Sequence, residues 1–213
     1  MEHRKPLSSE EINGILGNYK NRLGEYVKPY IHKNIIPINE YVYVVHKGDD
    51  IYNDLINKHA RGVCPVENGH IYLRDDVEIT AHLLIHEFIH RLSRNRKFVM
   101  ASRSWCWVEG IDFPSDYLTY INEAITEMIT VDIMGELEEN NPYNKGLKVI
   151  DMLCNKIDKT AIIYAYMSGN RKFFKNMLKK DYKNFKDNFL FMMSYSQSDE
   201  YEKELMNIIN RLP

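Results

Sequence analysis

The chain has 213 residues, of which 44% are hydrophobic and 27% charged, as in an ordinary globular protein that can bury a core without disulfides. Its net charge of -2 gives no general attraction to nucleic acid, so we expect no nucleic-acid partner. No apolar run approaches the ~20 residues of a membrane span, so we expect no membrane-spanning segment. The composition leaves the oligomeric state open.

The three cysteines, Cys64, Cys106 and Cys154, lie far apart and form no Cys-x-x-Cys pair. An odd number of isolated cysteines is a poor disulfide framework and favours a reducing compartment. Residues 1–6 are not followed by the apolar core of a signal peptide. As written, the sequence predicts a cytoplasmic protein, with non-classical export or removal of a leader as the alternatives.

Short helices and strands are predicted in the first third of the chain. They cover residues 9–23 (helix), 41–45 (strand), 50–59 (helix) and 69–74 (strand). The first helix has Ser8 or Ser9 as its N-cap, and Glu11 supports the cap. The strand at 41–45 is rich in tyrosine and valine and is expected to be buried.

Helical periodicity dominates the rest of the sequence. Two long helices are predicted over residues 77–93 and 117–137, and the chain after Pro142 is expected to be all-helical. Breaks in the helical pattern fall near Gly169 and near residues 194–198. Between the two long helices, residues 98–117 contain glycine and proline and predict a loop. Strands are therefore expected only in the first third, which predicts an α+β fold with a small N-terminal sheet and a helical C-terminal half.

Residues 86–90 read His-Glu-Phe-Ile-His and carry the strongest chemical signal in the chain. Residues four apart on a helix share a face, so His86 and His90 can both reach one Zn²⁺ ion at ~2.0–2.1 Å. Glu87 points in a different direction and can accept a proton from water beside the metal without being a ligand. The apolar neighbours indicate burial, which is costly for imidazoles that have no partner.

A pair of glutamates supplies a candidate for the third ligand. Glu123 and Glu127 are four residues apart in the predicted helix 117–137 and share a face. A catalytic zinc site needs three protein ligands and one open position. One carboxylate can bind the metal, while the other accepts the remaining N–H of a ligand histidine and fixes its tautomer. The alternative is a surface helix with two exposed glutamates.

Together, the two segments resemble the gluzincin metallopeptidases, of which the thermolysin-like enzymes are the best known. In that family, His-Glu-x-x-His is followed on a second helix by Asn-Glu-x-x-x-Asp/Glu, which Asn122, Glu123 and Glu127 match. The resemblance covers roughly residues 70–130. It implies a zinc-dependent metallopeptidase with one catalytic zinc ion and a peptide or protein as its substrate.

The resemblance also implies a role for each motif residue and an organisation of the chain. The metal ligands would be His86, His90 and Glu123, with Glu87 as general base and later proton donor to the leaving amine, and Glu127 orienting His86. A zincin-like core over residues 1–138 would carry both metal-binding helices, and a helical subdomain over residues 139–213 would pack on it as part of one continuous domain. The strand at 69–74 would border the cleft and offer an exposed edge to an extended peptide.

The chain departs from the thermolysin-like pattern in two respects. Glu123 follows His90 by 33 residues, a longer spacing that is closer to that of toxin-type and pro-peptidase gluzincins. No residue matches the distal catalytic histidine, so the group that stabilises the oxyanion is open. In several compact gluzincins a tyrosine about two turns before the third ligand has this role, which makes Tyr117 the first candidate and Tyr120 the second. Either tyrosine can instead be a packing residue.

Other interpretations stay open. Cys64 precedes the motif helix, and a cysteine is the third ligand in peptide deformylases, which would make the chain a different zinc amidohydrolase. The chain can also be a non-catalytic zincin-like binding module with a structural or vestigial metal site. His82, one turn before His86, can border the site or belong to the core. The basic segment 171–186 can contact an acidic partner or a membrane surface, but a solvated helix face with its aromatic residues turned inward is the favoured interpretation.

Overall fold

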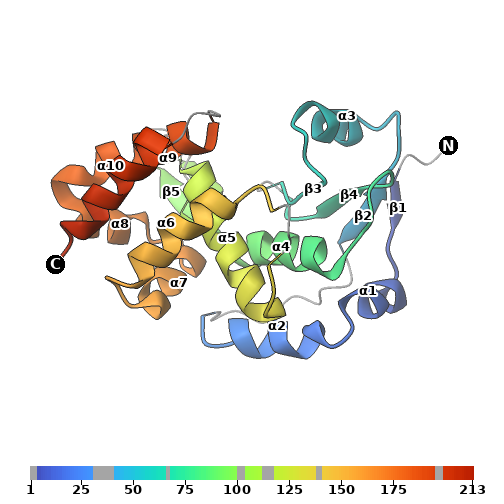
Figure 1. Cartoon of the computed structure of the whole chain (residues 1–213). Coiled ribbons are helices and arrows are strands. Elements are labelled where there is room, and N and C mark those ends of the chain that lie inside the picture. Colours follow the sequence, from blue (N-terminus) through green and yellow to red (C-terminus); the bar gives the residue numbers. More distant parts are fainter. Residues whose placement is uncertain are drawn as a thin grey trace. The chain divides into compact units, whose positions relative to one another are not determined.

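The computed structural model describes residues 4–30, 41–65, 68–99, 104–111, 118–137, 141–194 and 199–213. The fold is mixed α+β, as the sequence predicts. The chain forms two compact units, Met1–Arg94 and Asn95–Pro213 (Figure 1). None of the helices in the described residues has the length and apolar character needed to cross a lipid bilayer.

The catalytic core expected over residues 1–138 takes in the whole first unit and the beginning of the second. The expected core is drawn to include both helices that carry motif residues, whereas the two units of the structure are separated by their compactness. The expected division at residue 138 therefore stays a prediction.

The first unit contains a four-stranded mixed sheet in the order β1-β2-β4-β3. The strands are β1 (Arg4–Pro6), β2 (Val42–Val45), β3 (Gly62–Val63) and β4 (Ile71–Arg74). β2 and β4 run parallel, while β1 and β3 are antiparallel to their neighbours. The strands predicted at 41–45 and 69–74 are confirmed as β2 and β4. β1 and β3 are too short to produce a recognisable sequence pattern.

The position of β4 corrects the expectation that residues 69–74 form an exposed edge. β4 pairs with β2 on one side and with β3 on the other, so its backbone groups are used within the sheet. In the described part of the chain the edge on this side is β3, in which Gly62 lies opposite Leu73. The sequence could not show this, because two residues carry no alternation.

The helices of the first unit are α1 (Ser9–Leu16), α2 (Tyr19–Val27), α3 (Asp50–Asn57) and α4 (Ala81–Leu92). The single helix predicted over residues 9–23 is wrong, because Gly17 has a positive φ of 50° and ends α1. A residue in that conformation interrupts helical hydrogen bonding, and glycine adopts it readily. The predicted N-cap at Ser8 and its support by Glu11 are confirmed as a capping box.

The capping box makes a prediction about acid stability. The Glu11 carboxylate accepts a hydrogen bond from Ser8 N at 2.8 Å. The hydrogen bonds with the backbone and side chain of Ser8 lower the pKa of Glu11 from 4.5 to about 2. A carboxyl whose pKa is lower in the folded state stabilises the fold above its unfolded pKa, and the effect fades as pH falls toward 2. In urea unfolding, wild type should exceed Glu11→Gln in stability at pH 6, and the difference should shrink steadily from pH 5 to pH 3. A constant difference would contradict this account.

The sheet of the first unit is covered on both faces. On one face, Val45, Leu55 of α3 and Tyr72 form a buried cluster. α4 also contacts β3 and β4, and Figure 1 shows α3 and α4 on opposite sides of the sheet. Side chains alternate between the two faces of a strand, so Ile71 and Leu73, the neighbours of Tyr72 in β4, face α4. The motif helix therefore lies directly against the sheet.

Two paired strands, β5 (Arg94–Val99) and β6 (Ser104–Glu109), begin at the boundary between the two units. They correct two expectations, that residues 98–117 form a loop and that strands occur only in the first third. β6 contains two tryptophans and a valine, which favour strands, and the glycine and proline that suggested a loop follow only afterwards.

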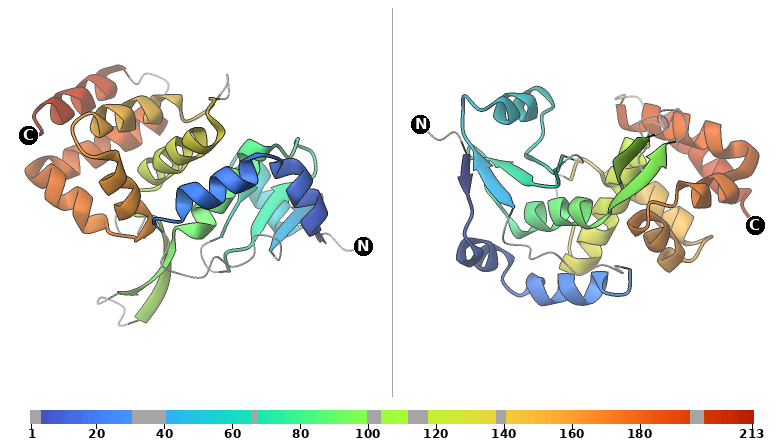
Figure 2. Two further views of the ribbon diagram at one scale, coloured as in Figure 1. Left: turned by 90° about the horizontal axis from the view of Figure 1, so that it is seen from below. Right: turned by 180° about the vertical axis from the view of Figure 1, so that it is seen from behind.

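The described residues from Leu118 onward are mainly helical, as predicted. The helices are α5 (Thr119–Met134), α6 (Asn144–Cys154), α7 (Lys159–Met167), α8 (Arg171–Leu178), the short 3₁₀ helix η2 (Lys179–Asp181), α9 (Tyr182–Ser194) and α10 (Asp199–Asn210). α5 packs against α6, α7 and α9, which Figure 2 shows around it. The predicted break near Gly169 is confirmed between α7 and α8, whereas residues 195–198 lie outside the described residues.

Candidate metal centre

The His-Glu-x-x-His segment lies in the middle of α4. The helix begins later than the predicted Val77, because Thr80 is the N-cap and its side chain accepts a hydrogen bond from Leu83 N at 3.2 Å. His86, Glu87 and His90 are 7%, 5% and 5% exposed. Burial of three polar side chains on one helix requires partners for them, which makes the segment a candidate site.

The two motif histidines turn the same ring nitrogen toward one another. His86 Nε2 and His90 Nε2 are 3.0 Å apart, and their rings meet edge to face. Two nitrogens bound to one tetrahedral zinc ion at ~2.0–2.1 Å lie about 3.3 Å apart, close to this separation. The separation is compatible with one metal ion between the two imidazoles, and equally with a hydrogen bond from one ring to the other.

The carboxylate of Glu87 lies against the edge strand β3. A Cβ placed on Gly62 would be 3.0 Å from Glu87 Oε1 and 2.8 Å from Leu73 Cδ2. Only a residue without a side chain fits here without moving one of these two groups. Nothing in the sequence indicates this contact, because Gly62 precedes the motif by 24 residues.

The second motif lies on α5, in the second unit. Glu123 is half-buried, and Asn122 and Glu127 are buried, at 2% and 1% exposure. Two exposed glutamates on a surface helix, the alternative interpretation, do not describe this segment. The predicted helix over residues 117–137 is confirmed, and Gly135 ends it in the left-handed conformation.

Asn122 ties α5 to the chain that follows β6. Its Oδ1 accepts a hydrogen bond from Ile111 N at 3.1 Å. A Cβ on Gly110 would come within 2.1 Å of the same oxygen, so the glycine allows this close approach. Thr126, one turn further on, donates to Asn122 O at 2.9 Å. These contacts fix the first turn of α5, on which Glu123 lies.

Glu127 has a partner that the sequence analysis missed. Asn141, itself buried, donates a short hydrogen bond from Nδ2 to Glu127 Oε1. The Asn141 carbonyl oxygen accepts from Tyr143 N at 2.8 Å, which orients the amide. An asparagine directly before Pro142 indicates a turn, and this is the only sequence signal that could have drawn attention to it.

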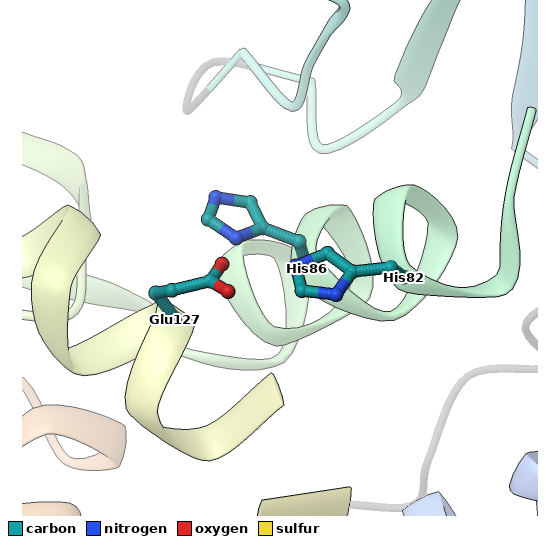
Figure 3. Close-up of side chains that lie close together, drawn as sticks. All are labelled: His82, His86 and Glu127. Atoms are coloured by element: carbon teal, nitrogen blue, oxygen red, sulfur yellow. The ribbon is translucent and has the colours of Figure 1, made fainter. Parts of the chain in front are cut away.

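Two groups of side chains offer the donor atoms that a divalent cation needs. One consists of His86, His90 and Glu123, and the other of His82, His86 and Glu127. In Figure 3, His82 and His86 project from successive turns of α4, and Glu127 from α5. Each group combines histidines of the first unit with a glutamate of the second, so the assembly of either group belongs to the proposal below.

The remaining candidates from the sequence contribute less. Tyr117 lies outside the described residues, so its proposed role stays a prediction. Tyr120 is half-buried in the first turn of α5. Cys64 is buried, and in the described residues it belongs to neither donor group.

The chain finds no match among protein-family models, curated proteins or solved structures. The resemblance to gluzincins therefore rests on the motif residues themselves. Two structural observations accompany this resemblance: the burial of the motif residues on α4 and the contacts of Asn122 and Glu127 on α5.

Proposed function

We propose that the protein is a zinc metallopeptidase of the gluzincin type, with a zincin-like core and a peptide or protein substrate. The observation that carries the proposal is the pair of buried imidazoles on α4, whose Nε2 atoms are 3.0 Å apart beside a buried carboxylate. Two histidines and an acid on one buried helical turn supply two metal ligands and a base.

Glu123 is the third ligand in this proposal. Zinc accepts a carboxylate oxygen beside two imidazoles, and three protein ligands leave one position open for catalysis. Glu123 offers a carboxylate and is half-buried, and it lies on the first turn of α5, which Asn122 fixes. The proposal therefore requires Glu123 to complete the ligand set that His86 and His90 begin.

The side chains then have distinct tasks in peptide hydrolysis. A bound Zn²⁺ supplies Lewis-acid chemistry, which polarises a substrate carbonyl and makes water more acidic. Glu87 accepts the proton of the attacking water and delivers it to the leaving amine. Glu127, held by Asn141, orients a ligand histidine, and Tyr117 donates a hydrogen bond to the oxyanion.

The direct test combines metal analysis with a peptidase assay. Protein dialysed against zinc should hold about one ion per chain and cleave peptides from a broad library. A chelator such as 1,10-phenanthroline should stop cleavage, and added zinc should restore it. A chain that binds zinc and cleaves neither the library nor intact proteins would contradict the peptidase and favour a binding module.

Gly62 provides a sharper prediction about the geometry of the base. In Gly62→Ala the new methyl group must displace Glu87 or Leu73, because it would lie within 3.0 Å of both. We expect kcat to fall about 10- to 100-fold while KM and zinc content change little, because small displacements of a catalytic group have effects of this size.

Two further variants separate catalysis from packing. Gly62→Ala/Leu73→Val removes the leucine Cδ2 that meets the new methyl, so it should recover stability without recovering kcat. Gly14→Ala is the matched control, since a Cβ there meets nothing within 4 Å. Recovery of kcat in the double variant would show that Gly62 acts through strand packing rather than through Glu87.

A further inference from the structure

A cavity of about 370 Å³ lies between helices α5 and α6, both of which belong to the second unit. The two helices pack against each other, and Figure 1 shows them as neighbours. From α5 the cavity is lined by Met128, Val131 and Asp132, which are three and four residues apart and therefore share one face of the helix. Small-molecule binding sites have volumes of about 300–1,000 Å³, so the cavity is large enough for a ligand.

The lining residues of α6 follow the same helical spacing. They are Asn144, Leu147, Lys148 and Asp151. Seven residues of an α-helix rise by about 10.5 Å, so Asn144 and Asp151 lie at opposite ends of the lined stretch of α6. The other side chains around the cavity are mostly apolar. The cavity therefore combines apolar walls with a polar group at each end.

Asn144 provides an acceptor at one end of the stretch. Its Oδ1 is buried and has no hydrogen-bond partner among the described residues. A buried acceptor without a donor costs free energy comparable to a lost hydrogen bond, and such atoms are rare in folded proteins. A ligand that donates an N–H or O–H to Asn144 removes this cost.

Asp151 provides a negative charge at the other end. The two other charged residues of the lining have partners, because Asp132 pairs with Lys159 at 2.7 Å and Lys148 lies 3.9 Å from Glu202. In the part of the chain that the structure describes, Asp151 has no such ion pair. The charge of the lining therefore favours a cation over an anion.

We propose that this cavity binds a small, mainly apolar amine that carries a hydrogen-bond donor at its far end. Asp151 attracts the ammonium group, Asn144 Oδ1 accepts from the donor, and the apolar walls cover the body of the molecule. A phenolic amine has these three parts. The site contains none of the proposed metal ligands and does not include Glu87, so it goes beyond the proposed peptidase and does not depend on it.

The test compares three molecules that differ by one group. Tyramine has a phenol and an ammonium group, phenethylamine lacks the hydroxyl, and 4-ethylphenol lacks the amine. The full chain is titrated at pH 7, with carbon-13 in its methionine methyl groups. Tyramine should bind with a Kd on the order of 0.1–1 mM, as suits a molecule of about ten heavy atoms. It should bind about fivefold more tightly than phenethylamine, the effect of one hydrogen bond, and about threefold more tightly than 4-ethylphenol, the effect of one exposed ion pair.

The labelled methyl groups also locate the ligand. Met128 lines the cavity, whereas Met192, which is buried on α9, does not. The Met128 resonance is assigned by its absence in Met128→Leu. It should move with tyramine concentration, while the Met192 resonance stays nearly unchanged.

Two variants assign the two polar contacts. Asn144→Ala should abolish the preference for tyramine over phenethylamine and keep the preference over 4-ethylphenol. Asp151→Asn should do the opposite, and it should fold like wild type because Asp151 is exposed. The matched control is Asp199→Asn, which replaces an exposed aspartate on α10 outside the cavity lining and should keep both preferences.

The outcomes are independent of the peptidase. Equal binding of the three molecules, or preferences that survive both variants, overturns the amine site. Shifts at other methionines while Met128 stays still overturn it as well. The titration needs neither turnover nor added zinc, so zinc content and chelator-sensitive cleavage decide the proposed function separately.

Discussion

Glu87→Gln should bind about one zinc ion per chain and lose peptidase turnover by about 10²- to 10⁴-fold, the usual contribution of a general base. Glutamine has nearly the same shape as glutamate, so the buried site and the contact with β3 should be preserved. It cannot accept the proton from water. The loss should therefore appear in kcat, with little change in KM or in the thermal unfolding midpoint.

The control for this variant is Glu78→Gln, which replaces an exposed glutamate just before α4. It removes the same charge from the same region and should leave turnover unchanged. Glu87→Gln protein that still cleaves peptides at the wild-type rate would rule out the role of Glu87 as the base. Loss of zinc in that variant would instead mean that Glu87 is a metal ligand.

Glu123→Ala should lose both zinc and activity, because two imidazoles alone hold zinc weakly and the third ligand closes the site. Glu127→Ala should retain zinc with an affinity about 10- to 100-fold lower, as expected for a residue that orients a ligand. Competition with a fluorescent zinc chelator measures both affinities on the same scale. The two glutamates lie one turn apart on α5, so each variant is the matched control for the other.

The reverse result would identify the second donor group. If Glu127→Ala lost the metal while Glu123→Ala kept it, the ion would be held by His82, His86 and Glu127. His82→Ala would then be as damaging as His86→Ala. Under the proposal, His82→Ala leaves zinc affinity nearly unchanged.

The sequence predicted the elements whose signals are local. Four-residue spacing located the histidine pair on α4 and the glutamate pair on α5, and the capping box located the start of α1. The break at Gly17 was missed because a single glycine within a helical pattern is often tolerated. β5 and β6 were missed because the glycine and proline that follow them dominated the interpretation of that stretch.

The contacts around the candidate site could not be predicted in the same way. Gly62 meets Glu87 only because β3 pairs with β4 and α4 lies against both, a consequence of tertiary packing. Asn141 reaches Glu127 across 14 residues that follow no regular period.

The most direct measurement is a crystal structure of the zinc-loaded protein with data collected on both sides of the zinc absorption edge. The account predicts one anomalous peak about 2.0–2.2 Å from His86 Nε2, His90 Nε2 and a Glu123 carboxylate oxygen, with no fourth protein ligand. A peak held by four protein side chains, or a zinc ion bound to the two histidines with Glu123 far away and no other group in its place, would contradict it.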